Sequence, residues 1–289
     1  MLDFVYVDVF AATPLTGAPL TLVTDADGIT DDQMRAVARE FNQSETTFVQ
    51  RPTLPDTTRR LRSFTPTGQE VYGAGHNALG AWLWLASTGE LEVHDEATYT
   101  QHIGDAVYPV HVRRDGDRVV VTMEQAPPVF GAVVTDRAEL AAALGLSPDD
   151  LVADRAAQVV STGAGHLLVP VRSRDAVDRA VPDGARLTAA LREVDGEGCY
   201  LYTLDTDATA YARFFNPAMG IWEDPATGTA AGPLAAFLAA GGDLVAVIEQ
   251  GHSMGRPSRI TVTVSGPRVQ VSGSGLVVAR GTMMLPAAS

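Results

Sequence analysis

The chain contains 289 residues, of which 46% are hydrophobic, and it carries a formal net charge of −14. That length allows one large domain or two of ordinary size, with ample material for a core. The acidic balance argues against a nucleic-acid-binding protein, because phosphates demand a basic surface. No apolar run approaches the roughly 20 residues that span a bilayer, so no membrane segment is expected.

Residue types that are missing exclude further classes of protein. All 21 basic residues are arginine, which excludes a lysine Schiff base and a standard Walker A loop. The single cysteine, Cys199, excludes an internal disulfide and suits a reducing compartment. The N-terminus lacks the basic segment of a signal peptide, and the histidines lack metal-ligand spacing. We therefore expect a cytoplasmic protein that uses no metal or cofactor.

The first part of the chain mixes strand and helix patterns. A capping box at Thr30–Gln33 predicts a helix through about Phe41, and an apolar run predicts a second helix near 76–87. A strand is predicted directly after Glu45, and others over 2–10, 19–24, 59–64, 106–113 and 117–124. No G-x-G-x-x-G follows the first strand, so a Rossmann domain is not expected.

Ala126-Pro127-Pro128 is the best candidate for a domain boundary. It divides the chain into domains 1–126 and 127–289, with a return of the last strand to the first domain left open. Helices are predicted near 136–145, 148–154, 173–180 and 185–193, and along the apolar run that ends at Gly241. Strands are predicted near 157–161, 166–171, 198–204, 209–215, 244–249, 258–264, 267–273 and 275–281.

Two stretches of the chain repeat the same residues in the same order. Arg62, Phe64 and Pro66 match Arg213, Phe215 and Pro217 at an offset of 151, and Glu70 and Gly75 match Glu223 and Gly228 at an offset of 153. Each set precedes an apolar helix whose first turn contains small residues, which leave backbone N–H groups open to an anion. The repeat predicts two related domains, with the two helix starts facing an interdomain cleft.

The side chains near these helix starts favour acid/base chemistry. No G-x-S-x-G elbow or cysteine–histidine pair indicates nucleophilic hydrolysis. The candidates that remain are the carboxylates and one histidine: Glu45, Glu70, Glu223, Asp224 and His76. N–H dipoles at a helix start favour a neutral histidine, and a carboxylate in a dry cleft suits reversible proton transfer at carbon. This combination predicts an isomerase or epimerase that needs no cofactor.

Five motifs resemble the phenazine biosynthesis PhzF-like family. They are Gln43-Ser-Glu-Thr-Thr-Phe48, Arg62-x-Phe-Thr-Pro66, Glu70-Val-x-x-Ala-Gly-His76, Glu223-Asp-Pro-Ala-Thr-Gly-Thr-Ala230 and Gln250-Gly-x-x-Met-Gly-Arg-Pro-Ser258. The resemblance covers nearly the whole chain. It implies an α/β (α+β) fold of the diaminopimelate epimerase-like type, with two related domains, each a curved mixed sheet wrapped around a central helix.

The resemblance also implies a function. Phenazine-pathway members isomerise trans-2,3-dihydro-3-hydroxyanthranilate, which implies a small carboxylated substrate, no cofactor and a homodimer. Carried over motif by motif, Glu45 moves the proton, while His76 and Asp224 orient the substrate and assist. The substrate-binding residues expected from the same motifs are Gly75, Asn77, Gly228, Thr229, Ala18, Tyr72 and Gly73.

Three departures from the family pattern concern the substrate. Gly-Asn-Pro near the N-terminus is Gly17-Ala18-Pro19 here, Pro-Phe before Ala-Gly-His is Tyr72-Gly73, and Ser after Thr-Gly is Thr229. They leave an isomerase of another secondary-metabolite substrate and a non-catalytic binding protein as alternatives. A two-thiol racemase is excluded, because its two cysteine positions hold Ala74 and Pro225.

Overall fold

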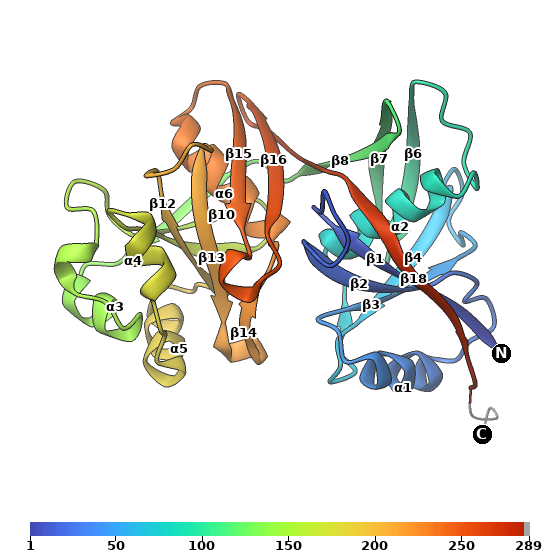
Figure 1. Ribbon diagram of the computed structural model, residues 1–289, viewed down its shortest axis with the longest axis horizontal. Coiled ribbons are helices and arrows are strands. Elements are labelled where there is room, and N and C mark those ends of the chain that lie inside the picture. The colour runs from blue at the N-terminus through green and yellow to red at the C-terminus, as the bar shows by residue number, and fades with distance from the viewer. Residues whose placement is uncertain (286–289) are drawn as a thin grey trace. The chain divides into compact units, whose positions relative to one another are not determined.

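The structure, a computed structural model, describes residues 1–285 and divides the chain into two units (Figure 1). Unit 1 contains Met1–Glu124 and the described residues from Ser272 onward, and unit 2 contains Gln125–Val271. The return to unit 1 is made by β18 (Gly275–Met283), which pairs antiparallel with β1 (Leu2–Val9). Both ends of the described chain therefore belong to the same sheet.

Unit 1 is a mixed sheet with two helices. The helices are α1 (Asp31–Phe41) and α2 (His76–Ser87). Its other strands are β2 (Ala18–Val23), β3 (Thr46–Gln50), β4 (Arg59–Phe64), β5 (Glu70–Val71), β6 (Glu96–Ile103), β7 (Ala106–Asp115) and β8 (Arg118–Gln125), the last of which ends at the boundary between the units.

Unit 2 has a mixed sheet with a larger set of helices. The strands are β9 (Val129–Val133), β10 (Gln158–Ser161), β11 (Gly165–Pro170), β12 (Gly198–Thr203), β13 (Ala210–Asn216), β14 (Ile221–Asp224), β15 (Leu244–Gln250), β16 (Ser258–Ser265) and β17 (Arg268–Gly273). The α-helices are α3 (Arg137–Ala143), α4 (Arg174–Arg179), α5 (Gly184–Glu193) and α6 (Gly228–Ala239), and short 3₁₀ turns cover Pro148–Asp150, Pro217–Met219 and His252–Met254.

The two sheets are built by the same sequence of strand pairings. In unit 1, β1–β2 is antiparallel, β2–β3 parallel, β3–β4 and β4–β5 antiparallel, β4–β6 parallel and β6–β7 antiparallel. In unit 2, β10–β11 is antiparallel, β11–β12 parallel, β12–β13 and β13–β14 antiparallel, β13–β15 parallel and β15–β16 antiparallel. This agreement confirms the internal repeat predicted from the sequence.

The same ion pair occupies the same place in both units. Arg62 of β4 donates two hydrogen bonds of 2.7 Å to the Glu70 carboxylate on β5. Arg213 of β13 donates two of 2.9 and 2.8 Å to Glu223 on β14. Each guanidinium also lies over the phenylalanine ring two residues later, 5.1 and 4.9 Å from its centroid. In each unit the pair ties together the two strands that lead into the apolar helix.

Those apolar helices are the centres of the two units. In α2, Trp82 is fully buried, stacks on Tyr99 and donates its indole N–H to Gln101 at 2.6 Å. A Cβ atom on Gly80 would lie 2.5 Å from Leu20, so the absence of a side chain lets α2 approach β2 closely. Helix α6 is buried along most of its length. Helices that are apolar on all sides belong in a core.

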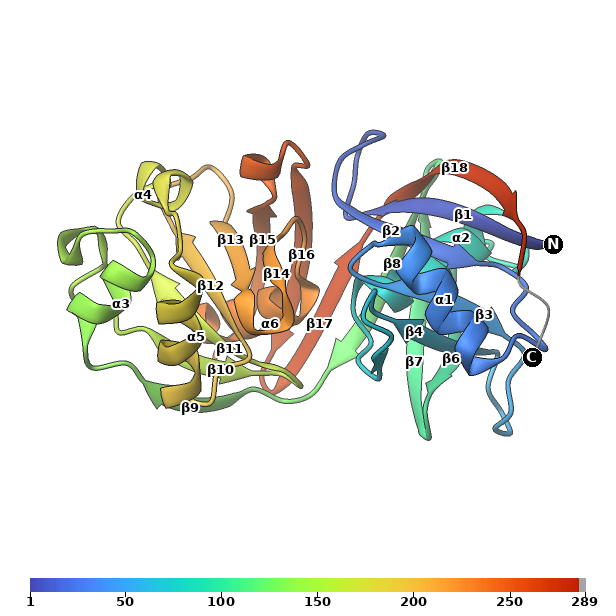
Figure 2. The same ribbon diagram turned by 90° about the horizontal axis from the view of Figure 1, so that it is seen from below.

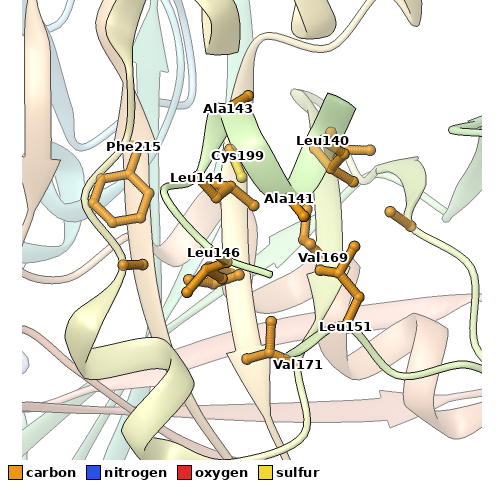
Figure 3. Packing of buried hydrophobic residues seen from close by; sticks show 14 of the residues in the cluster. Leu140, Ala141, Ala143, Leu144, Leu146, Leu151, Val169, Val171, Cys199 and Phe215 are labelled. Carbon is orange, nitrogen blue, oxygen red and sulfur yellow. The ribbon is translucent and has the colours of Figure 1, made fainter. Parts of the chain in front are cut away.

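Further helices cover another face of each sheet. In unit 1, α1 lies along one side of the sheet (Figure 1). Its Met34 and Val37 belong to the same core cluster as Phe48 and Phe64. In unit 2, α3, α4 and α5 lie to one side of the sheet (Figure 2). Leu140 and Leu144 contribute to a core that includes Cys199 of β12 (Figure 3). Each sheet thus lies between a central helix and an outer helical layer.

The predicted elements differ from the structure in a few places. The helix predicted near 148–154 is wrong: a 3₁₀ turn covers Pro148–Asp150, and Leu151 then forms a β-bridge with Val171. Strand β6 was not predicted, because its first five residues are exposed or half-buried and lack an apolar alternation. Strand β9 has no buried residue at all. The short strands β5 and β14 exist because of their pairing with β4 and β13.

We predict that Arg213→Ala will lower the free energy of unfolding by about 3–5 kcal/mol, because it leaves the Glu223 carboxylate partly buried without its partner. Arg213 also donates to the carbonyl groups of Val177, Asp178 and Ala180, which would lose their donor. Denaturant unfolding measures the change. Arg186→Ala is the matched control, because its bidentate pair with Glu139 is half-exposed and should contribute little. Equal losses in the two variants would contradict the prediction.

Candidate active site

The start of α2 is shaped by Asn77. The N-cap, Gly75, has no side chain to accept the free N–H groups of the first turn. Asn77 instead holds the N-cap residue and the loop before it: its Oδ1 accepts from the Gly75 N–H at 2.7 Å, and its Nδ2 donates to the Gly73 carbonyl at 3.0 Å and to Ser63 Oγ at 3.1 Å. Ser63 in turn meets Thr47 Oγ1 at 2.9 Å. Because Asn77 is 1% exposed, its side chain positions the Gly73–Gly75 loop.

His76 is the first residue of α2, and its ring contacts the loop that contains Glu45. Its Nε2 lies 3.4 Å from Ser44 Oγ. Burial lowers the pKa of His76 to about 4, so the imidazole is neutral above that pH. The sequence argument expected the same direction from helix-start dipoles, whereas burial is its main cause here. A neutral imidazole can donate from one nitrogen and accept at the other.

Glu45 stands between the Ser44–His76 contact and the first residue of β3. The residue is half-buried, and its Oε2 atom is shielded from solvent. Strand pairing fixes this position, because Thr46 pairs with both Thr21 and Phe64. The backbone of Glu45 is therefore anchored to the sheet by the residue that follows it. A shielded carboxylate next in the chain to a serine that contacts a neutral histidine is a suitable arrangement for proton transfer.

Three of the residues that depart from the family pattern, Ala18, Tyr72 and Gly73, differ in their surroundings. Ala18 begins β2 and is 1% exposed. Tyr72 is 60% exposed, and a Cβ atom on Gly104 would lie 3.1 Å from its ring. A Cβ atom on Gly73 would meet no heavy atom within 4 Å. The backbone two residues before the α2 N-cap therefore borders open space.

In unit 2, Asp224 belongs to a buried polar network. The Thr227 hydroxyl donates to the Asp224 carboxylate, and Gln250 Nε2 donates to the Asp224 carbonyl at 2.6 Å and to Thr227 Oγ1 at 3.0 Å. Gln250 Oε1 accepts from the Thr227 N–H at 3.2 Å and from the Tyr200 hydroxyl at 2.8 Å. Burial raises the pKa of Asp224 to about 6, and the charge of Glu223 adds to the increase against the opposing Thr227 hydrogen bond.

The start of α6 corresponds to that of α2, but its polar side chain differs. Gly228 and Thr229 are its first two residues, and Thr229 takes the place of His76 at the offset of 153. Gly228 is buried and its carbonyl accepts from Gln125 Nε2 at 3.0 Å. Thr229 is half-buried and lies 3.3 Å from His166 Nε2. The first turn of α6 therefore offers a hydroxyl where α2 offers an imidazole.

Residues far along the chain hold the Asp224–Thr227 loop. Ser258 Oγ donates to the Pro225 carbonyl at 2.8 Å. Gly251 has φ +79°, and a Cβ atom there would lie 2.3 Å from the Arg256 carbonyl oxygen and 2.6 Å from that of Pro225. The motif between Gln250 and Ser258 thus acts as a clamp on the loop before α6. The sequence marked the motif but did not reveal its contact with Pro225, nor the roles of Thr227 and His166.

Other candidate groups contribute nothing to these two sets of residues. Cys199 lies in the core of unit 2, where burial raises the pKa of its thiol to about 12. Within residues 1–285, no group of three or more His, Cys, Asp or Glu side chains could hold a metal ion.

In the same range, no helix is both long and apolar enough to cross a membrane.

We predict that stability will depend on pH through Asp224. A pKa raised to about 6 means that the native state binds the Asp224 proton more tightly than the unfolded state. The resulting stabilisation is full below the unfolded pKa and is lost as pH rises through about 6. Relative to Asp224→Asn, the wild-type free energy of unfolding should therefore fall by roughly 2 kcal/mol between about pH 4 and pH 7. Parallel pH profiles of the two proteins, measured by denaturant unfolding, would refute this.

We also predict that Gly251→Ala will destabilise unit 2 more than Gly255→Ala. Both glycines flank the His252–Met254 turn with positive φ, but only Gly251 has backbone atoms where a Cβ would go. Each substitution places an alanine in the left-handed region, at about 1–2 kcal/mol. Gly251→Ala adds overpacking of about 1–3 kcal/mol. Thermal and denaturant unfolding compare the stabilities of the two variants. Equal losses of stability would show that the backbone around Gly251 moves to accommodate the methyl group.

Comparisons with known proteins agree with this architecture. The family model described as phenazine biosynthesis-like protein (PhzC-PhzF) matches residues 7–281. A solved structure of a PhzF-family phenazine biosynthesis protein from Bacillus anthracis superposes with a TM-score of 0.91 at 27% identity, covering 98% of this chain and 99% of that one. This confirms the predicted fold class.

Two curated relatives are similar over almost their whole length. The trans-2,3-dihydro-3-hydroxyanthranilate isomerase of Pseudomonas fluorescens is 34% identical, covering 99% of this chain and 100% of the relative. An uncharacterized isomerase of Bacillus subtilis, YfhB, is 31% identical, covering 96% of each. These findings favour an enzyme over a non-catalytic binding protein. The chain belongs to the PhzC-PhzF phenazine biosynthesis-like family and is an isomerase of that family.

Proposed function

We propose that the protein moves a proton between two carbons of a small carboxylated substrate, with Glu45 as the acid/base group and without a cofactor. The observation that carries this proposal is the placement of Glu45. Its carboxylate is partly shielded from solvent, and the residue lies between Thr46, the first residue of β3, and Ser44, which contacts His76 at the start of α2. A positioned carboxylate typically contributes about 10²–10⁴-fold to such a proton transfer.

The chemistry needs only side chains of this chain. Glu45 takes a proton from one carbon of the substrate, so that one C–H bond breaks and the carboxylate becomes a carboxylic acid. The same group returns the proton to another carbon, where a new C–H bond forms. No electron acceptor is consumed, because the atoms of substrate and product are the same. The negative charge that develops on the substrate is stabilised by hydrogen-bond donors.

We assign supporting roles to residues of both units. His76, neutral because its pKa is about 4, donates or accepts a hydrogen bond without competing for the transferred proton. Asp224, whose pKa is raised to about 6, can hold or release a proton near neutral pH. Gly75, Gly228 and Thr229 lie at helix starts, whose N–H groups favour a carboxylate. Asn77 holds its loop and acts on the substrate only through it.

Two candidate substrates are supported, one by the relatives and one by the surroundings of Tyr72 and Gly73. A relative that isomerises trans-2,3-dihydro-3-hydroxyanthranilate supports a carboxylated ring. The open space at Gly73 and the exposed ring of Tyr72 support a second candidate, an isomerase of a different or larger carboxylated compound in another secondary-metabolite pathway. A role in phenazine biosynthesis, a homodimeric state and a cytoplasmic location stay predictions.

We predict that Glu45→Gln will lower turnover by about 10²-fold or more, because the amide cannot accept the substrate proton. The measurement is conversion of trans-2,3-dihydro-3-hydroxyanthranilate in D₂O, followed by NMR. Wild-type protein should incorporate solvent deuterium into the product, and the variant should not, while ligand binding and the melting temperature change little. Glu40→Gln, which alters an exposed carboxylate of α1, is the matched control.

The outcomes of this experiment test the role of Glu45 and the identity of the substrate separately. Wild-type turnover by Glu45→Gln would remove Glu45 from the mechanism. No conversion by folded wild-type protein would reject this substrate and favour the second candidate. The next measurement would then be deuterium exchange into a panel of carboxylated ring compounds. Exchange into one of them that is lost in Glu45→Gln would identify the substrate and keep the mechanism.

A further inference from the structure

His166 is a buried histidine of unit 2 that has no role in the proposed proton transfer. It lies on β11 opposite Gly198 of β12 and is 3% exposed. A Cβ atom on Gly198 would lie 2.4 Å from the Phe214 ring and 3.3 Å from His166 Nδ1. The Phe214 ring is also edge-on to the imidazole, with centroids 5.0 Å apart. Close packing on these sides fixes the plane of the imidazole.

The two ring nitrogens of His166 have different surroundings. Nε2 lies 3.3 Å from Thr229 Oγ1, on the first turn of α6. Nδ1 is shielded from solvent and has no hydrogen-bond partner among the described residues. Burial lowers the pKa of His166 to about 4, so near neutral pH only one of the two nitrogens carries a proton.

The position of that proton follows from the cost of burying an unpaired donor. A proton on Nδ1 would be an N–H group without an acceptor, and leaving a buried group unsatisfied costs roughly 1–3 kcal/mol. Orphaned buried N–H groups are also rarer than under-satisfied acceptors. A proton on Nε2 instead finds Thr229 Oγ1. The surroundings therefore favour the tautomer in which Nε2 donates and the Thr229 hydroxyl oxygen accepts.

This tautomer determines what the Thr229 hydroxyl can do. With its oxygen engaged by His166, the O–H proton is free to be donated elsewhere. Thr229 is half-buried, whereas its neighbours Gly228 and Ala230 are buried, so its side chain is the part of the first turn that a ligand can reach. The start of a helix of this length favours an anion through its own N–H groups. A hydroxyl donor adds to that preference.

We propose that His166 is a positioning residue that holds the Thr229 hydroxyl as a hydrogen-bond donor to a carboxylate oxygen of the substrate. The proposal rests on the proposed function in one respect, namely that the substrate carries a carboxylate. It assigns to unit 2 a specificity for anionic ligands. His166 acts through Thr229 and does not itself touch the substrate.

The first test is the tautomer of His166, measured in protein labelled with ¹⁵N-histidine. Two-bond ¹H–¹⁵N correlations distinguish a protonated from an unprotonated ring nitrogen, and the loss of signals in His166→Gln assigns the residue. We expect a neutral ring with the proton on Nε2 from about pH 5 to pH 8. A proton on Nδ1, or a ring that titrates within this range, would overturn the proposal. This test needs no ligand.

The second test measures binding of anthranilate, a carboxylated ring, by calorimetry, with aniline as the probe that lacks the carboxylate. Thr229→Val and His166→Phe should each weaken anthranilate binding by about 10-fold, the usual loss for a hydrogen bond to a charged group. The double variant should be no weaker, because both changes remove the same interaction. Thr229→Ser and His166→Gln keep the hydroxyl and a side-chain N–H donor, and should bind like wild type.

The remaining outcomes contradict the proposal. Unchanged affinity in His166→Phe, additive losses in the double variant, or no preference of wild-type protein for anthranilate over aniline would each reject it. Melting temperatures of all variants show whether a loss of binding is a loss of fold. Failure of the proposed function is recognised separately: turnover by Glu45→Gln would refute the proton transfer and would leave the tautomer and the anthranilate preference unaffected.

Discussion

A guanidinium bound between a carboxylate and a phenylalanine ring is the interaction on which both halves of this protein depend. Arg62 and Arg213 each join two strands that share few backbone hydrogen bonds, because β5 and β14 are only two and four residues long. Those short strands lead to the N-caps of the two central helices. The ion pairs therefore hold the short strands from which the helix starts, and the side chains assigned to chemistry, take their position.

The two helix starts use different devices to satisfy the same backbone groups. At α2, the Asn77 side chain accepts from the N–H of the N-cap residue Gly75 and donates to the Gly73 carbonyl in the preceding loop. At α6, Gln250 reaches from the end of β15 to bind Thr227 and Asp224. One device is local in sequence and the other is not. The repeat has therefore kept the backbone arrangement while its side-chain supports have diverged.

The sequence predicted what depends on local pattern. The apolar run of α2, the capping box at Thr30 and the position of Glu45 before a strand all follow from residues that are neighbours in the chain. Contacts between residues that are far apart in the chain could not be predicted from the sequence. Nothing near Gln250 indicates that it binds the loop before α6, and nothing near His166 points to Thr229. Such contacts depend on strand order, which the pattern of a single strand does not contain.

The pairing of β18 with β1 has a consequence for biosynthesis on the ribosome. Strand β1 precedes all of unit 2 in the chain, whereas one of its two neighbours, β18, follows unit 2. Unit 2 is complete once Val271 has emerged, whereas unit 1 must wait for β18. Domains generally fold as units during synthesis. Unit 2 can therefore fold before unit 1, although most of unit 1 is made first. Until β18 has been made, the edge of β1 that pairs with it stays unpaired and open to a chaperone that binds strand edges.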